Sequence, residues 1–311
     1  MDGIINVYKE KGYTSHDVVA KMRGILRMKK IGHTGTLDPE AEGVLPVCLG
    51  RGTKLCDMLT DKSKTYRAVL LLGRETDTQD TTGAVLEEHP VDVTEEEVRE
   101  AVMGFLGHYD QVPPMYSALK VGGKKLYELA RAGKEVERQA RQVEILDIQV
   151  EEIRLPRVAM TVSCSKGTYI RTLCYDIGRK LGCGGCMESL LRTRVDRFGL
   201  AGSLKLSEIE RLRDEGRIED YIVPVDGIFQ DIPAIHTLPE FDRLVHNGNW
   251  FFPEQASGTG TVCEGTAEEG GQSPFVPRAR VYDSQGQFIG VYQYREEKQR
   301  YQPQKIFLGG N

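Results

Sequence analysis

The order of apolar runs along this 311-residue chain constrains its fold more than any other feature. Runs with a two-residue period, which predict strands, are interspersed irregularly with runs of helical period. Several pairs of predicted strands have no helix between them, whereas a parallel pair needs a long crossover connection. The pattern therefore favours an α+β fold, in which helices flank a mixed, mainly antiparallel central sheet, over a doubly wound parallel fold.

The individual elements follow from periodicity and from capping residues. Ser15 is the predicted N-cap of the first helix, and Thr94 begins a capping box at the start of the clearest helix. Leu146, Ile148 and Val150 alternate with polar residues, which predicts a strand with one wet face. Strands are predicted at residues 3–8, 44–49, 66–72, 146–150 and 158–164, and helices at 15–29, 53–59, 94–106 and from 167 onward.

The character of the chain changes near residue 230. The segment from Pro224 to Pro233 predicts a domain boundary, because helical periodicity is sparse beyond it and short strand-like runs take over. These runs lie at 279–282, 288–294 and 304–308, with a hairpin turn at 283–286. We therefore expect a larger domain at 1–230 and a small β-rich domain at 231–311. Within the small domain, the Gly-rich residues 255–274 predict a mobile loop.

Charge is strongly segregated along the chain. The net charge of −5 argues against a nucleic-acid partner when taken as an average. Residues 74–110, however, carry eleven Asp and Glu against two Arg, whereas residues 1–34 and 120–141 each carry seven Lys and Arg against three acids. Such a chain can hold a polyanion on one face, although charge runs are also common on solvated surfaces.

Membrane, secretory and metal-binding proteins are disfavoured. No run approaches 18 consecutive apolar residues, and the N-terminus lacks a basic region followed by an apolar stretch. Seven scattered cysteines are typical of reduced thiols in a cytoplasmic protein. The one close pair, Cys183 and Cys186, lacks the two further ligands that a zinc site needs. We therefore expect a cytoplasmic protein that uses no metal and no cofactor.

Residues 32–45 form the most unusual segment of the chain. Gly32 and Gly35 let the backbone adopt positive φ or approach a ligand closely. Pro39 forces Asp38 out of the α region into an extended conformation. Asp38 is therefore expected on a stiff loop just ahead of a buried strand, where reactive groups are common. An isolated Asp-Pro pair is also a frequent turn initiator.

This segment resembles the signature loop of the TruB family of pseudouridine synthases. That loop has the pattern G-x-x-G-x-L-D-P-x-A-x-G-x-L, and every fixed position is matched here from Gly32 to Leu45. Three further stretches are similar to the family in the expected order. They are residues 12–15 (family G-x-T-S), 64–68 (K-x-Y) and 167–173 (G-x-Y-I-R-x-L). The resemblance covers residues 3 to about 226 well and the tail loosely.

The resemblance implies a fold, an activity and a set of site residues. The implied fold is that of pseudouridine synthases with a PUA-like RNA-binding domain at the C-terminus. The implied enzyme is an isomerase that converts uridine 55 in the T-loop of tRNA to pseudouridine, acting as a monomer without guide RNA or membrane. Asp38 becomes the catalytic aspartate, Arg171 its ion-pair partner and Tyr66 the tyrosine that stacks on the target base. His33 becomes the side chain that helps to displace that base, and Leu190 lines the pocket. Lys9, Gly35 and Lys64 are further candidate substrate-binding residues, and Lys124, Lys125 and Arg131 of the basic segment are expected to contact T-arm phosphates.

Chemical reasoning from these residues agrees with that assignment. Moving uracil from an N1–C1′ bond to a C5–C1′ bond needs a carboxylate, a dry pocket that holds the detached ring, and removal of a proton from C5. Arg171 can form a two-pronged pair with a carboxylate and keep it ionised where burial disfavours the charge. Three starting steps are compatible with such a carboxylate: attack at C1′, attack at C6, or removal of a ribose proton.

The implied tRNA partner rests on a basic insertion and on base flipping. Residues 116–141 lie where the family has an insertion that closes over the T-arm. The target base lies inside the folded loop, so it must be flipped out to react.

Two other functions remain open from the sequence. One is a guide-RNA-dependent relative of the family, although such proteins usually carry basic extensions that this chain lacks. The other is a protein that binds and refolds the T-arm without needing catalysis. The chain also departs from the family at Tyr8-Lys9-Glu10, where Asp-Lys-Pro is common, which weakens any role for that segment.

Overall fold

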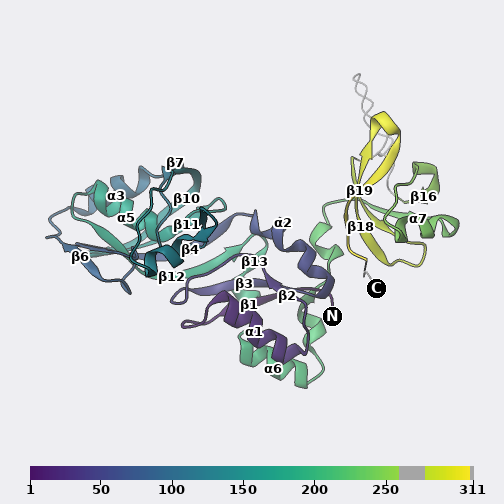
Figure 1. Ribbon diagram of the computed structural model, residues 1–311, viewed down its shortest axis with the longest axis horizontal. Coiled ribbons are helices and arrows are strands. Elements are labelled where there is room, and N and C mark those ends of the chain that lie inside the picture. Colours follow the sequence, from purple (N-terminus) through teal and green to yellow (C-terminus); the bar gives the residue numbers. More distant parts are fainter. Residues whose placement is uncertain (259–276, 309–311) are drawn as a thin grey trace.

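The computed structural model describes residues 1–258 and 277–308, which form two main β-sheets with flanking helices (Figure 1). From residue 259 onward, the loop predicted at 255–274 lies outside the described residues. Within the two described ranges, no helix is long and apolar enough to cross a bilayer.

The larger sheet has ten strands and is mixed, as predicted. Among its described pairings, β3 and β12 run parallel and the other strands pair antiparallel. The expected α+β class with a mainly antiparallel sheet is therefore confirmed. The strand order is β14 (Ile222–Val223), β1 (Gly3–Lys9), β3 (Glu42–Leu49), β12 (Gly185–Val195), β4 (Lys64–Leu72), β11 (Arg157–Cys164), β10 (Arg141–Arg154) and β7 (Gly107–Gln111), with β13 (Phe198–Gly199) beside β12 and β2 (Ile31–His33) beside β3.

Helices cover this sheet in two groups. Helices α1 (Ser15–Leu26) and α6 (Leu206–Asp214) pack on β1 and β3, and helices α3 (Glu95–Met103) and α5 (Ile170–Lys180) pack on the half of the sheet around β4, β10 and β11. Strand β3 serves two cores because its side chains alternate in direction. Leu45 and Val47 face α1 and α6, whereas Val44 and Cys48 face η1 (Gly50–Leu55) and α2 (Cys56–Thr60).

The N-cap of α1 differs from the prediction. Thr14, not Ser15, caps the helix, and it forms a reciprocal capping box with Asp17. Ser15 is fully buried, and its hydroxyl accepts a hydrogen bond from the Leu37 amide at 2.9 Å. The predicted cap was wrong because the Ser15 side chain is used to hold the loop that carries Asp38. The helix also ends three residues earlier than predicted, where Arg27 adopts a left-handed conformation.

Strand β10 also differs from the predicted alternation. Ile148 is buried as predicted, but Leu146 is 49% exposed and Ile145 is buried in its place. A register shift between Ile145 and Asp147 in the pairing with β11 explains the difference. A bulge of this kind adds one residue and changes the face on which the preceding side chains lie.

The second sheet has five strands and lies at the far end of the molecule from α3 and α5 (Figure 1). The rings of Phe288 and Phe307 contact Phe229 in η4 (Asp226–Phe229), and they share an apolar cluster with Val44 and Cys48 of the larger sheet. The Lys54 ammonium also donates to the carbonyl oxygen of Ile306 at 2.9 Å. The elements are β15 (Ala234–Thr237), α7 (Asp242–His246), β16 (Ala256–Ser257), β17 (Arg278–Tyr282), β18 (Phe288–Arg295) and β19 (Arg300–Ile306).

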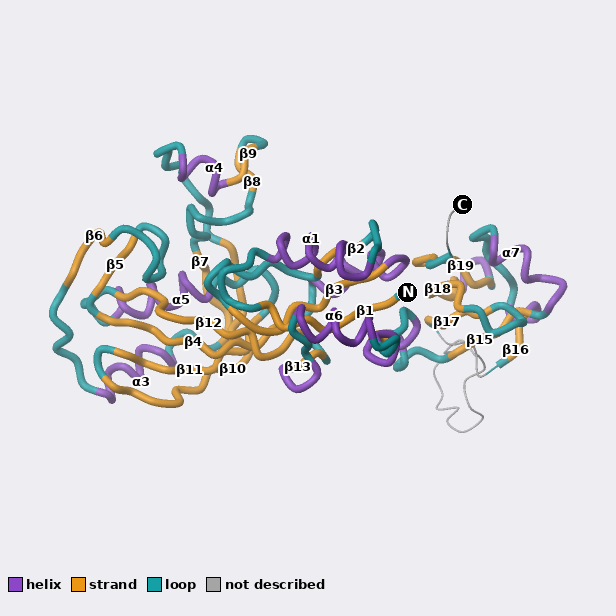
Figure 2. Tube along the Cα trace, turned by 90° about the horizontal axis from the view of Figure 1, so that it is seen from below, coloured by secondary structure: helices purple, strands orange, loops and turns teal. Residues whose placement is uncertain are grey.

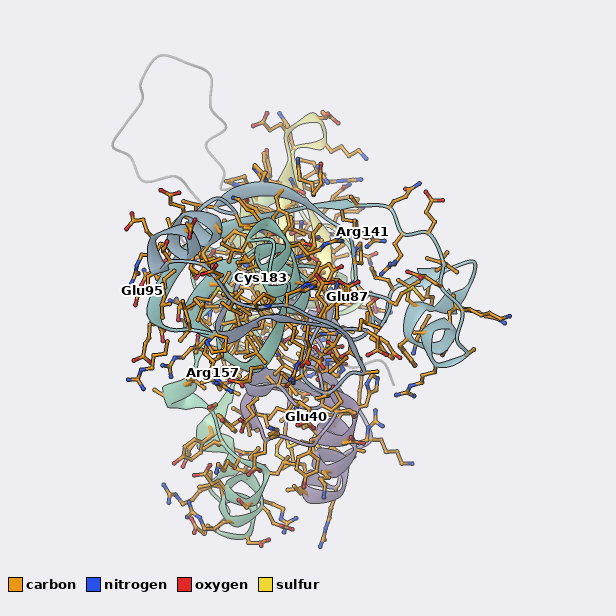
Figure 3. All side chains as sticks on the ribbon, turned by 90° about the vertical axis from the view of Figure 1, so that its left-hand side faces the viewer. Glu40, Glu87, Glu95, Arg141, Arg157 and Cys183 are labelled. Atoms are coloured by element: carbon orange, nitrogen blue, oxygen red, sulfur yellow. The ribbon has the colours of Figure 1, made fainter. Side chains whose placement is uncertain are left out.

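Two short hairpins stand outside both sheets. The acidic one pairs β5 (Arg74–Thr76) with β6 (Val85–Glu88). The basic one pairs β8 (Lys120–Val121) with β9 (Lys124–Lys125) and continues into α4 (Leu126–Arg131), and this segment projects from the body of the molecule (Figure 2). Glu95 of the acidic stretch lies on the opposite side from that projection (Figure 3). Helix α3 and the basic segment therefore lie on different sides of the molecule, whereas the acidic hairpin lies nearer the segment, where Asp77 accepts a hydrogen bond from Tyr116.

We predict that Gly43→Ala destabilises the protein far more than Gly107→Ala. Both glycines have positive φ (106° and 92°), which costs a non-glycine residue roughly 1–3 kcal/mol. A Cβ at Gly43 would also lie 2.2 Å from the Arg192 carbonyl oxygen, whereas one at Gly107 meets nothing within 4 Å. Overpacking adds roughly 1–3 kcal/mol. Denaturant unfolding of both variants measures the difference, and equal losses would show that β3 and β12 can separate without penalty.

Candidate active site

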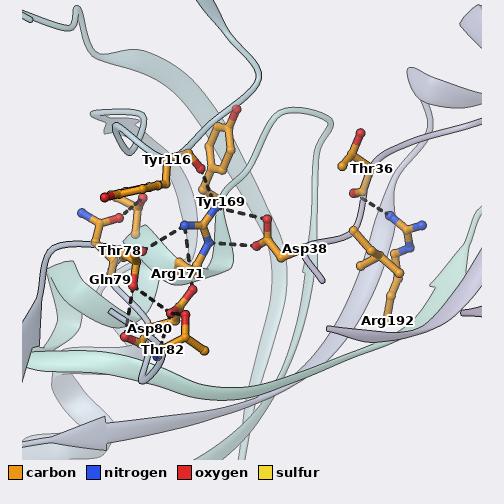
Figure 4. A network of polar contacts seen from close by, with 12 residues as sticks. Thr36, Asp38, Thr78, Gln79, Asp80, Thr82, Tyr116, Tyr169, Arg171 and Arg192 are labelled. Atoms are coloured by element: carbon orange, nitrogen blue, oxygen red, sulfur yellow. Dashed lines mark hydrogen bonds and ion pairs between the residues drawn. The ribbon is translucent and has the colours of Figure 1, made fainter. Parts of the chain in front are cut away.

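Asp38 lies on the loop between β2 and β3, where it pairs with Arg171 in the polar network of Figure 4. The loop is held mainly by side chains, since it has few ladder partners of its own. The Ser15 hydroxyl accepts a hydrogen bond from the Leu37 amide, and the Thr60 hydroxyl donates a hydrogen bond to the Thr34 carbonyl oxygen at 3.2 Å. The Asp38 side chain remains 37% exposed. The loop therefore presents one carboxylate to solvent from a constrained backbone.

Arg171, in the first turn of α5, binds this carboxylate through two of its guanidinium nitrogens. Its Nε lies 2.8 Å from Oδ2 of Asp38, and one terminal nitrogen donates to Oδ1 at 3.3 Å. The guanidinium also donates to the carbonyl oxygens of Thr78 and Tyr116, each at 2.9 Å. Only 5% of its side chain is exposed. The paired geometry is the strong, directional form of a charge-assisted interaction.

Asp80 is a second carboxylate in this network, and the sequence analysis missed it. Its Oδ2 lies 3.9 Å from a terminal nitrogen of Arg171, and its side chain is 16% exposed. Oδ1 accepts hydrogen bonds from the Thr82 amide and from the hydroxyls of Thr78 and Thr82. In the sequence, Asp80 is one of eleven acids in an acidic stretch, and no local signal distinguishes it from the others.

Tyr66 and Leu190 lie on neighbouring strands beside Asp38. Tyr66 is 8% exposed on β4, and Leu190 packs against the same apolar cluster from β12. Burial raises the pKa of Tyr66, and the adjacent Arg192 guanidinium acts in the opposite direction. The hydroxyl is therefore neutral at physiological pH. Both side chains belong to the apolar cluster that also contains Leu37, the residue before Asp38.

His33 and Gly35 lie on the other flank of the loop. The His33 ring makes an edge contact with His16 at 5.2 Å between centroids, and its Nδ1 accepts the Gly35 amide at 3.3 Å. Burial, followed by the charges of His16 and Arg192, lowers the pKa of His33 from 6.5 to about 4. A neutral ring is suited to stacking and to wedging into a nucleic-acid loop more than to ion pairing.

Lys9 and Lys64 were predicted to bind substrate, but their ammonium groups are directed at the protein backbone. Lys9 is fully buried and donates to the carbonyl oxygens of Ala41 (2.5 Å), Pro39 (3.0 Å) and Glu10 (3.3 Å). Lys64 donates to two carbonyl oxygens in the turn before β4. Burial lowers the pKa of each to about 8. In this structure the two ammonium groups hold backbone carbonyl oxygens of the Asp38 loop and of the turn before β4.

Lys124, Lys125 and Arg131 lie on the projecting basic segment, away from Asp38. Lys125 and Arg131 lie over the ring of Tyr127, at 5.3 and 5.5 Å from its centroid. The base of this segment reaches the site, because the Tyr116 carbonyl oxygen accepts from Arg171. The structure therefore separates the predicted residues into a compact centre and a cationic arm attached to it.

The chain was compared with known protein families. The family model described as TruB family pseudouridylate synthase (N terminal domain) matches residues 23–170, and the model described as tRNA pseudouridylate synthase B C-terminal domain matches residues 171–230. The tRNA pseudouridine synthase B of Lachnoclostridium phytofermentans is 52% identical, over 99% of this chain and all of that protein. Its counterpart in Clostridium perfringens is 43% identical over 96% of each chain.

Solved structures give the same fold. A Cbf5-Nop10-Gar1 complex contains a chain with a TM-score of 0.70 and 24% identity, covering 98% of this chain and 85% of that one. A chain of an H/ACA RNP bound to a substrate RNA has a TM-score of 0.70 and 22% identity, covering 99% and 85%. At this identity the likeness shows the architecture alone. Sequence identity across the full length and two consecutive family models give more: the chain belongs to the TruB family of pseudouridylate synthases.

Proposed function

We propose that this protein isomerises uridine 55 in the T-loop of tRNA to pseudouridine, and that Asp38 is its essential carboxylate. The observation that carries the proposal is the two-pronged pair between Asp38 and Arg171, set on a constrained loop beside Tyr66. The full-length relatives are named tRNA pseudouridine synthase B, which supports tRNA as the substrate class. We further propose that the protein acts as a cytoplasmic monomer without guide RNA or cofactor.

In the proposed reaction each side chain has a distinct task. The target uridine is flipped out of the T-loop, and its ring stacks on Tyr66 against Leu190. His33, being neutral, helps to displace the base. The Asp38 carboxylate acts on the ribose–base unit so that the N1–C1′ bond breaks, the ring turns, and C5 bonds to C1′ before losing its proton. Arg171 keeps the carboxylate charged and oriented while bound substrate displaces water.

The charge layout supports binding of the T-arm over the face that carries the basic arm. Phosphate contacts from Lys and Arg provide most of the affinity of such complexes and set their register. We propose that the basic segment 116–141 closes over the T-arm. We also propose that residues 1–230 form the catalytic domain and 231–311 a small PUA-like RNA-binding domain.

A direct assay tests the proposal. Purified protein is incubated with an unmodified tRNA transcript and no guide RNA, and pseudouridine is mapped by carbodiimide treatment and primer extension. We expect modification at position 55 alone. Tight binding without any product would instead support a protein that only refolds the T-arm, and product formed only with added guide RNA would support the guide-dependent mode.

The first prediction concerns Asp38→Asn. The change is nearly isosteric, and Arg171 keeps its two backbone carbonyl partners, so the loop and the fold should survive. The variant loses the anionic oxygen that starts glycosidic cleavage. We expect normal tRNA affinity by gel shift, normal flipping reported by a fluorescent base analogue, and no detectable pseudouridine. A rate within about tenfold of wild type, equivalent to about 1.4 kcal/mol of barrier, would contradict the role of Asp38.

The second prediction concerns Arg171→Lys. A lysine balances the charge of Asp38, but it lacks the planar guanidinium group. It therefore cannot bond both carboxylate oxygens of Asp38 and the carbonyl oxygens of Thr78 and Tyr116 at the same time. We expect the single-turnover rate to fall about 10²-fold, as for other small misplacements of reacting groups. Arg179→Lys is the matched control, since Arg179 is exposed near the end of the same helix. Near-normal turnover in Arg171→Lys would remove this residue from the catalytic set.

The third prediction concerns the basic arm. Changing Lys124, Lys125 and Arg131 together to Ala should weaken tRNA binding and flatten its salt dependence by roughly 0.7–0.9 log units for each lost phosphate contact. The control replaces three arginines that are already paired with glutamates: Arg99, Arg154 and Arg157. Binding measured over a salt series decides the matter. An unchanged slope in the first variant would identify the arm as a solvated surface.

A further inference from the structure

Arg192 is a buried cation that the proposed mechanism does not use. It lies on β12 between β3 and β4, is 1% exposed, and heads the largest fully buried side chains of the described residues. Burial lowers its pKa, yet a guanidinium stays protonated in proteins. No carboxylate within the described parts of the chain forms an ion pair with it. A buried charge without an ionic partner is costly, so its retention points to a task.

Its hydrogen bonds identify the task. Nε donates to the Val44 carbonyl oxygen at 2.7 Å, and the two terminal nitrogens donate to the carbonyl oxygens of Thr36 (3.4 Å) and Gly35 (3.3 Å). Thr36 and Gly35 are the second and third residues before Asp38. Figure 4 shows Arg192 reaching Thr36 on the side of Asp38 opposite Arg171. One guanidinium therefore ties the start of the loop to the strand that follows it.

The same side chain also adjoins Tyr66. Arg192 and Tyr66 are directly paired across β12 and β4, and the guanidinium lies beside the tyrosine hydroxyl. The loop that carries Asp38 and the strand that carries Tyr66 therefore both contact the guanidinium of Arg192. Lys9 acts on the other side of Asp38, where it holds the carbonyl oxygens of Pro39 and Ala41.

We infer that Arg192 is a positioning residue for the isomerisation, which fixes the distance and orientation of the Asp38 loop relative to Tyr66. The inference rests on the proposed function. Gly35 and Thr36 accept these bonds through their backbone oxygens, and the guanidinium that donates them comes from strand β12 of the sheet. The three carbonyl oxygens come from two segments of the chain, and the planar fork of the guanidinium bonds all three of them in one fixed arrangement.

Two substitutions test the inference, with Arg194 as the matched control. Arg192→Met keeps the volume and removes all donors, and Arg192→Lys keeps the charge with a single donor group. Arg194 lies two residues further along β12, is exposed, and donates from its Nε to the Asp196 carbonyl oxygen. We expect kcat to fall about 10²-fold in Arg192→Met, with KM and tRNA affinity nearly unchanged, since the loss is one of geometry in the transition state. Arg192→Lys should restore part of the rate, and Arg194→Met should match wild type.

The measurements separate positioning from folding. Thermal unfolding gives the folded fraction of each variant, and rates are expressed per folded protein. If Arg192→Met does not fold, the comparison of Arg192→Lys with wild type carries the test. Wild-type kcat in a folded Arg192 variant, or a loss confined to KM, would overturn the inference. Absence of pseudouridine with the wild-type protein would instead contradict the proposed function itself.

Discussion

The buried guanidinium of Arg171 is the interaction on which the rest of the site depends. A charge that is 5% exposed must be satisfied by the protein, and Arg171 draws its partners from separate parts of the chain. Asp38 comes from the loop after β2, Thr78 and Asp80 from the turn between β5 and β6, and Tyr116 from the base of the basic arm. Satisfying one side chain therefore assembles the carboxylate, a second acid and the arm around the N-terminal end of α5.

The Asp38 loop is rigid for a different reason. It contributes little to the sheet ladder, so its carbonyl groups are bonded by side chains that approach from both flanks. At least one carbonyl oxygen of the loop accepts a hydrogen bond from each of Thr60, Arg192 and Lys9. The Ser15 hydroxyl accepts a hydrogen bond from the Leu37 amide. Buried polar networks of this kind define a single conformation when every member is satisfied. The carboxylate can then remain partly exposed to substrate without being free to move.

Charge is also distributed unevenly over the molecule as a whole. The acidic residues of α3 lie away from the basic arm, so a net charge of −5 coexists with a cationic face. The cations Lys9, Lys64 and Arg192, which are all buried, add positive charge near the Asp38 loop. A polyanionic substrate would therefore meet surface cations on the arm and a neutral His33 and Tyr66 at the centre.

Local pattern determined much of this protein. The mixed sheet and the capping box at Thr94 follow from periodicity and capping residues, and the pairing of Asp38 with Arg171 was implied by the family resemblance. Tertiary structure alone decided which charges are buried and what they bond. In the sequence, Asp80 resembles any other acid of its stretch, Ser15 resembles a helix cap, Lys9 resembles a substrate-binding residue, and Arg192 resembles its exposed neighbour Arg194. The physical reason is that burial and hydrogen-bond partners depend on contacts between segments far apart in the chain, which no local sequence pattern encodes.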